Sequence, residues 1–149
     1  MIYISEISEQ DLSGLALAYM KTFNSDPWFE RWVQSDAKKR LQDLYQSPNF
    51  DGLMLLDGKT PIGGVFGRKE RFFDGDSFRI DEFWIQRSFQ DNGYGTALME
   101  KLREQLAGSV KSIYLITMHN PKTAGFYQKS GFSVNDGFCI MHLNMQEKS

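Results

Sequence analysis

The sequence has only one cysteine, Cys139. A single thiol cannot form an internal disulfide, and without a second cysteine there is no C-x-x-C pair to bind zinc. We therefore expect neither a disulfide framework nor a metal site, and we expect Cys139 to pack in the core.

The sequence also lacks an excess of positive charge and a long apolar run. Its 17 lysines and arginines are outnumbered by 19 acidic residues, giving a net charge of -2 and no basic face for nucleic acid or anionic lipid. No stretch approaches the ~20 apolar residues that span a bilayer. The first ten residues lack a positively charged start and an apolar core. We expect a cytoplasmic protein with no nucleic-acid or membrane partner.

The chain length of 149 residues is typical of a single domain. A domain of this size buries roughly 70% of its extended surface, which is enough for a self-sufficient core. The sequence contains no repeat, linker or low-complexity stretch. We therefore predict one domain over residues 1–149.

Two helices are predicted before the first long strand. Ser8, with Asp11 three residues later, caps a helix that runs to about residue 23, and a second helix ends near residues 47–48. The break between them is at residues 24–27. The apolar residues at helical spacing are Leu12, Leu15, Ala16, Tyr19, Met20 and Phe23 in the first helix, and Ala37, Leu41, Leu44 and Tyr45 in the second.

A predicted hairpin and a β-α-β unit follow. Residues 52–56 and 60–66 form the hairpin, a mobile polar connection covers residues 68–75, and a strand covers residues 77–85. A helix with an apolar face then ends at Gly108, and residues 113–118 form the next strand. This crossover predicts two parallel strands.

The C-terminal part begins with a capped helix. Asn120 precedes a proline at the first helical position, and Gly131 follows the end of this short helix. Apolar residues then alternate over 139–145, which predicts a half-exposed antiparallel strand. The fold class is α+β, with a mixed sheet whose central strands are parallel.

The run of residues 90–97 lies between the strand at 77–85 and a helix. Gly93 and Gly95 permit a tight turn, and the helix N-terminus offers N–H donors to an anion, so a pyrophosphate fits here. No arginine or lysine lies between positions 88 and 100, so the N–H groups and the helix dipole must neutralise the charge. An ordinary strand-to-helix turn is the alternative for this motif alone.

Further motifs accompany the glycine loop: Glu82, then Gln90-x-x-Gly93-x-Gly95, then Asn120 and the run over residues 124–132. In this order and spacing the chain resembles the GNAT acetyltransferase superfamily, and more loosely its small-molecule branch that includes aminoglycoside N-acetyltransferases. The resemblance implies a mostly antiparallel sheet with splayed central parallel strands and helices on both faces. It also implies an acetyl-CoA-dependent N-acetyltransferase that acetylates a small-molecule primary amine by direct attack, and a possible homodimer.

The resemblance places acetyl-CoA (coenzyme A) between the splayed strands. The backbone of the first strand would hold the pantetheine arm and polarise the thioester carbonyl. Lys122 or Lys129 is a candidate cation for the ribose phosphate, although a solvated helix lysine is the simpler interpretation. The residues implied in coenzyme binding are Phe83, Trp84, Ile85, Gln90, Asp91, Asn92, Gly93, Tyr94, Gly95, Thr96, Asn120 and Tyr127.

Two residues have implied catalytic roles. Glu82 would bind the amine or accept its proton, because an alkyl ammonium of pKa ~10.4 must lose a proton before it attacks. Strand alternation puts Glu82 and Trp84 on one face and Asp81 and Phe83 on the other. Tyr127 would protonate the leaving thiolate. The alternatives are that Glu82 pairs with a neighbouring arginine, Arg79 or Arg87, and that Tyr127 only packs its helix.

Trp28 and Phe73, together with Glu82, are the candidate substrate-binding residues. Both aromatics lie in segments that also contain acids, which suits a cationic amine, although packing in the core or at a dimer surface is equally compatible. Three other functions remain open. They are a catalytically weak acetyl-CoA-binding sensor or interaction module, a protein or peptide N-acetyltransferase, and, more distantly, a dinucleotide-binding oxidoreductase.

Overall fold

The computed structural model describes residues 1–146. Its contacts group the chain into a unit from Met1 to Thr117 and a second unit that begins at Met118. That residues 1–149 form a single domain stays a prediction. Among the described residues, no helix is both long and apolar enough to cross a membrane.

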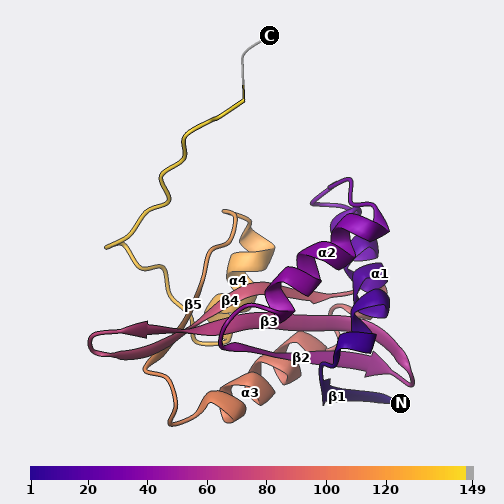
Figure 1. Ribbon diagram of the computed structural model, residues 1–149, viewed down its shortest axis with the longest axis horizontal. Helices are drawn as coiled ribbons and strands as arrows, with labels where there is room; N and C mark the ends of the chain where they lie inside the picture. The colour runs from indigo at the N-terminus through magenta and orange to yellow at the C-terminus, as the bar shows by residue number, and fades with distance from the viewer. Residues whose placement is uncertain (147–149) are drawn as a thin grey trace. The chain divides into compact units, whose positions relative to one another are not determined.

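The first unit is built on a five-stranded sheet with the order β1-β2-β3-β4-β5 (Figure 1). Neighbouring strands are antiparallel except β4 and β5, which are parallel. The α+β class and the mostly antiparallel mixed sheet are therefore confirmed. The strands are β1 (Ile2–Glu6), β2 (Phe50–Asp57), β3 (Thr60–Phe72), β4 (Gly75–Ile85) and β5 (Ser112–Leu115).

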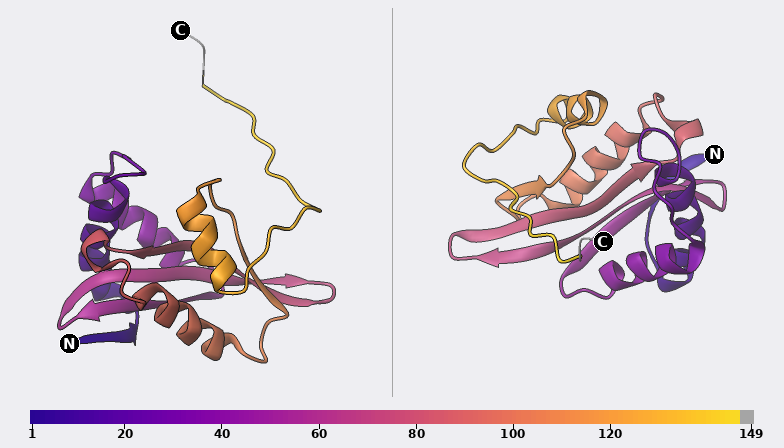
Figure 2. Two further views of the ribbon diagram at one scale, coloured as in Figure 1. Left: turned by 180° about the vertical axis from the view of Figure 1, so that it is seen from behind. Right: turned by 90° about the horizontal axis from the view of Figure 1, so that it is seen from above.

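Helices cover both faces of this sheet, as predicted. The helices α1 (Leu12–Phe23) and α2 (Gln34–Tyr45) lie on one side, and α3 (Tyr94–Leu106) lies on the other (Figures 1 and 2). The predicted cap before α1 is confirmed, because the Ser8 N–H donates to the Asp11 carboxylate at 2.8 Å. A short 3₁₀ turn, Glu9–Asp11, precedes α1, and another, Arg87–Phe89, follows β4.

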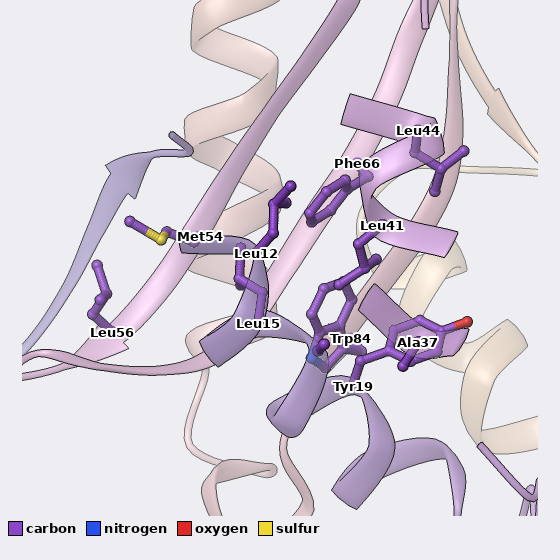
Figure 3. Packing of buried hydrophobic residues seen from close by; sticks show 11 residues of the cluster. Leu12, Leu15, Tyr19, Ala37, Leu41, Leu44, Met54, Leu56, Phe66 and Trp84 are labelled. Carbon is purple, nitrogen blue, oxygen red and sulfur yellow. The ribbon is translucent and has the colours of Figure 1, made fainter. Parts of the chain in front are cut away.

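The core between α1, α2 and the sheet contains the apolar helix faces predicted from the sequence. Figure 3 shows Tyr19 from α1 beside Trp84 from β4, with Leu41 from α2 and Phe66 from β3 nearby. The rings of Phe66 and Trp84 are stacked with centroids 5.7 Å apart. This packing fixes β4 against the helices at the point where Trp84 lies.

The β3–β4 hairpin is longer than predicted. Residues 68–75, which we expected to be a mobile connection, continue β3 to Phe72, and β4 begins at Gly75. Polar cross-strand contacts explain the difference: Arg68 pairs with Asp81 at 3.7 Å, and the hydroxyl of Tyr114 donates to Glu70. Such pairs stabilise a strand whose side chains are not apolar.

A β-bulge interrupts β4 at Asp81. Phe66 of β3 lies opposite Glu82 and Gly67 lies opposite Ile80, so Asp81 is the extra residue. Because Arg68 follows Phe66 by two residues and pairs with Asp81, Asp81 lies on the same face as Phe66 and Glu82. The prediction that Asp81 faces away from Glu82 was therefore wrong, because strict alternation does not hold across a bulge.

The second unit contains α4 (Pro121–Lys129), and its predicted cap is confirmed. The Asn120 side-chain oxygen accepts from the N–H groups of Lys122 at 3.0 Å and Thr123 at 3.3 Å.

The strand predicted over residues 139–145 is not formed. The described residues after α4 contain no strand, and Met141 and Leu143 are exposed. Cys139 is exposed as well, so the prediction that it packs in the core was wrong. Alternation specifies two faces, but a strand also needs a partner for its backbone groups. β5 therefore ends the sheet order among residues 1–146.

Candidate active site

Glu82 is a carboxylate held between α1, α2 and β4. Its Oε1 accepts from the Tyr19 hydroxyl at 3.0 Å and from Arg40 Nη2 at 3.3 Å. The Glu82 side chain is 14% exposed, whereas Arg40 is 41% exposed. Within residues 1–146, both of these contacts use Oε1, so Oε2 is the oxygen left for another group.

Burial dominates the ionisation of Glu82 and raises the pKa of its carboxyl. The Arg40 charge and the two hydrogen bonds lower this pKa, and the carboxylate of Glu30 raises it. The pKa of the Tyr19 phenol lies above its usual 10.0 because of burial and the neighbouring Glu82 charge. Tyr19 is therefore a neutral donor, and Glu82 binds its proton more tightly than an ordinary glutamate does.

Aromatic rings surround the Tyr19 side of this cluster. The Tyr19 ring lies 4.6 Å from Phe23, 5.3 Å from Trp32 and 5.2 Å from Trp84 between centroids. Trp28 joins the group through Phe23, at 5.7 Å. Trp28, a predicted substrate-binding residue, thus contacts Phe23, and Phe23 contacts the ring of Tyr19, whose hydroxyl donates to Glu82.

A surface hollow of about 470 Å³ lies in the segment between α1 and α2. The Trp32 indole N–H donates to the Glu30 carboxylate at 2.7 Å, and the Asn24 side chain bonds both backbone groups of Trp32, at 2.8 and 2.9 Å. These bonds fix an acidic and aromatic wall beside the cluster. The hollow is lined by Phe29, Glu30, Arg31, Trp32 and Asp36.

The two arginines predicted as alternative partners of Glu82 pair with other carboxylates. Arg79 Nε lies 3.2 Å from the Asp81 carboxylate, and Arg87 Nη1 lies 3.7 Å from that of Asp26. Glu82 instead accepts a hydrogen bond from Arg40, which was not predicted as a partner. The prediction that Glu82 and Trp84 share a face is confirmed, because both contact Tyr19.

The end of β4 leads into the glycine loop. Pairing of β4 with β5 stops at Ile80 and Leu115, so Phe83, Trp84 and Ile85 lie beyond the last β5 pair. The ladder thus ends before residues 83–85, where the resemblance implied a splay between the two parallel strands. The side-chain amide of Gln90 donates to the Ile85 carbonyl at 2.8 Å and thereby links the glycine loop to the end of β4.

Gly93 is the N-cap of α3 and has φ +81, and Asp91 has φ +63. The first N–H groups of a helix have no partner within the helix. A glycine cap brings no side-chain oxygen to these amides, in contrast to Asn120 at α4. The first backbone N–H groups of α3, at Tyr94, Gly95 and Thr96, therefore receive no side-chain oxygen from the N-cap residue. Asn92 donates instead to the Gln90 carbonyl at 3.0 Å.

Two predicted site residues lie apart from Glu82 or outside its unit. Phe73 is fully exposed at the turn of the β3–β4 hairpin. The length of β4 from Gly75 separates it from Glu82 by roughly 23 Å at ~3.3 Å per residue. The structure therefore does not bring Phe73 together with Glu82, because the hairpin is longer than expected, and a substrate-binding role for Phe73 stays a prediction. Tyr127 belongs to the second unit, where its ring contacts Phe126 at 5.2 Å and Phe132 at 5.6 Å.

Comparisons with known proteins agree with this fold. The model of the acetyltransferase (GNAT) family matches residues 17–132. A comparison with curated protein sequences gives no significant match.

Several solved structures resemble the chain over nearly its whole length. A possible acetyltransferase from Clostridium difficile 630 has a TM-score of 0.82 at 11% identity, covering 99% of both chains. An aminoglycoside acetyltransferase from an uncultured soil metagenomic sample has a TM-score of 0.72 at 18% identity, covering 99% of both chains. A GNAT family acetyltransferase from Staphylococcus aureus has a TM-score of 0.71 at 23% identity, covering 95% of this chain and 98% of the other. At these identities the likeness establishes the fold.

Proposed function

Because the chain belongs to the GNAT acetyltransferase family, we propose that it transfers the acetyl group of acetyl-CoA to a primary amine of a small molecule. The observation that carries this proposal is the largely buried Glu82 carboxylate on β4, the strand that leads into the loop before α3. We further propose that residues 1–149 work as one domain.

The glycine loop fits the diphosphate of the coenzyme. Gly93 at φ +81 caps α3 without a side-chain oxygen, so the first-turn N–H groups and the helix dipole are available to an anion. The loop backbone from Gln90 to Thr96 would bind the diphosphate, and the β4 backbone at residues 83–85 would bind the pantetheine arm. The bound coenzyme supplies an acetyl thioester. Asn120 and Tyr127 are the proposed contacts from the second unit.

Glu82 is the proposed amine-binding group and proton acceptor. At pH 7, removing a proton from an ammonium of pKa ~10.4 costs roughly 4–5 kcal/mol, and a carboxylate beside the amine reduces this barrier. Oε1 is held by Tyr19 and Arg40, so Oε2 faces the amine. Burial raises the pKa of Glu82 and thus makes it a stronger base.

Tyr127 is the proposed general acid that protonates the departing thiolate. A direct attack of the amine needs no nucleophile from the protein. Cys139, which is exposed in the segment after α4, is not part of this proposal.

The acceptor is proposed to be a cationic small molecule. Glu30 and Trp32 form one wall of the hollow between α1 and α2, and the Glu30 charge acts on Glu82. Acidic and aromatic groups suit an alkyl ammonium. One of the similar structures is an aminoglycoside acetyltransferase, which makes aminoglycosides a first class of amine to test. The protein is further proposed to act in the cytoplasm and to form homodimers.

An amine panel tests the function. The protein is incubated with acetyl-CoA and polyamines, aminoglycosides or peptide N-termini, and free thiol is followed. Thiol release that requires a small amine supports the proposal, and Glu82→Gln must slow it, most strongly at low pH. Release only with peptides favours the peptide acetyltransferase. Calorimetric binding of acetyl-CoA without turnover on any amine favours the sensor that Asp91, an acid in the phosphate loop, suggests.

A further inference from the structure

Two side chains from different helices converge on one oxygen of Glu82. The Tyr19 hydroxyl comes from α1 and donates to Oε1 at 3.0 Å, and Arg40 comes from α2 and reaches the same atom at 3.3 Å. Neither residue belongs to the glycine motif or to the strand, and the proposed transfer gives neither of them a role.

We infer that Tyr19 and Arg40 are positioning residues, which fix Glu82 through Oε1 so that Oε2 points to the acceptor amine. This inference rests on the proposed function, because it assigns the two residues to the reaction through Glu82. Neither needs to touch the amine or the coenzyme.

The position of the Tyr19 hydroxyl is fixed by packing. Its ring is buried, with Trp84 at 5.2 Å and Trp32 at 5.3 Å, both nearly perpendicular to it. A phenol held in this way cannot follow a moving carboxylate, so the hydrogen bond restricts Glu82 to one orientation. Arg40 is longer and partly exposed, and it contributes mainly its charge.

Both residues also keep Glu82 ionised. Burial raises the pKa of Glu82, the Arg40 charge and the Tyr19 hydrogen bond oppose this, and Glu30 is the further charge that raises it. Removing either donor leaves the buried carboxylate less stabilised and makes its protonation easier.

The test compares Tyr19→Phe and Arg40→Met with two matched controls on α2. Tyr45→Phe removes only the hydroxyl of a ring that packs on Phe50, and Lys39→Met removes an exposed charge. The Glu82 carboxyl is titrated by ¹³C NMR of glutamate-labelled protein and assigned by its absence in Glu82→Gln. We expect a higher midpoint in Tyr19→Phe and Arg40→Met, an unchanged midpoint in both controls, and partial recovery in Arg40→Lys. A midpoint that stays at the wild-type value in Tyr19→Phe or Arg40→Met overturns the inference.

Kinetics then separate positioning from folding. At pH 7, kcat/KM for the amine should fall roughly tenfold in Tyr19→Phe, the size of one hydrogen bond to a charge, while acetyl-CoA binding measured by calorimetry stays the same. An unchanged kcat/KM overturns the inference. If the wild-type protein acetylates no amine, the proposed function fails, whereas the titration still decides whether Tyr19 and Arg40 hold Glu82.

Discussion

Two glycines at opposite ends of α3 offer a controlled test of the phosphate loop. Gly93 precedes the helix with φ +81, and Gly108 follows it with φ +79. A Cβ built on either residue meets no atom within 4 Å, so alanine creates no clash at either position. The two substitutions therefore differ only in which end of α3 they strain.

The magnitude follows from the backbone alone. A left-handed alanine costs roughly 1–2 kcal/mol, and the less flexible unfolded chain returns about 0.4–1 kcal/mol of this. Each variant should therefore lose about 1 kcal/mol, which lowers Tm by roughly 2–4 °C in a chain of this size. Because relaxing φ at residue 93 turns the first amides of α3 away from the loop, Gly93→Ala should also bind coenzyme A at least tenfold more weakly. One charge-assisted hydrogen bond accounts for such a loss.

The assay is calorimetric titration with coenzyme A, together with thermal unfolding of both variants. Gly108→Ala should show the same fall in Tm and wild-type affinity. Equal affinities in the two alanine variants would refute the assignment of the diphosphate to the loop, because the strain at residue 93 would then have no effect on the ligand.

Three further predictions concern catalysis and stability. Tyr127→Phe should lower kcat by about 10²-fold or more with unchanged coenzyme affinity, and steady-state rates at the wild-type level would exclude the acid role. Because burial raises the pKa of Glu82, its ionisation should reduce the stability of the folded wild-type protein as the pH rises above 4.5, the ordinary pKa of a glutamate. The free energy of unfolding in urea should therefore decline less with pH in Glu82→Gln than in wild type, and parallel pH curves would contradict the raised pKa. Phe66→Ala should cost roughly 3–5 kcal/mol in the same measurement, because Phe66 is fully buried against Trp84, whereas a loss below ~1 kcal/mol would mean that this contact is not part of the core.

Local periodicity predicted the helices well. The apolar residues of α1 and the cap at Ser8, before the 3₁₀ turn that leads into α1, predicted the helix over Leu12–Phe23. A helix face is encoded within a few turns of the chain, so the sequence contains the whole signal. The sequence also predicted a tight turn at Gly93, between a strand and a helix, and the structure has a left-handed N-cap there.

The partners of Glu82 were not predictable in this way. Tyr19 lies 63 positions from Glu82 in the sequence and Arg40 lies 42 positions away. Tyr19 was correctly assigned to the apolar face of the first helix, but periodicity does not predict which residue its hydroxyl contacts. Arg40 follows Lys38 and Lys39, and no local pattern distinguishes the cation that turns inward. The packing of α1 and α2 on the sheet makes this selection.

Strands were less well predicted because they depend on their neighbours. The polar residues 68–72 form a strand because they pair with residues 75–79 of β4, and Arg68 and Glu70 bond to Asp81 and Tyr114, although their own sequence suggested a loop. Residues 139–145 show the opposite error, with an alternating pattern but no strand in the structure. In both segments the deciding interactions lie outside the segment.

The bulge at Asp81 places two consecutive side chains of β4 on one face of the sheet. Before the bulge the odd-numbered Arg79 and Asp81 lie on the face that carries Phe66, and after it the even-numbered Glu82 and Trp84 do so. Deleting Asp81 would join Ile80 to Glu82, which already lie on opposite faces, so both halves of β4 would keep their orientation. Deleting Phe83 would instead put Glu82 and Trp84 on opposite faces, because side chains alternate along a strand. A loss of one residue from β4 should therefore be tolerated better at position 81 than at position 83.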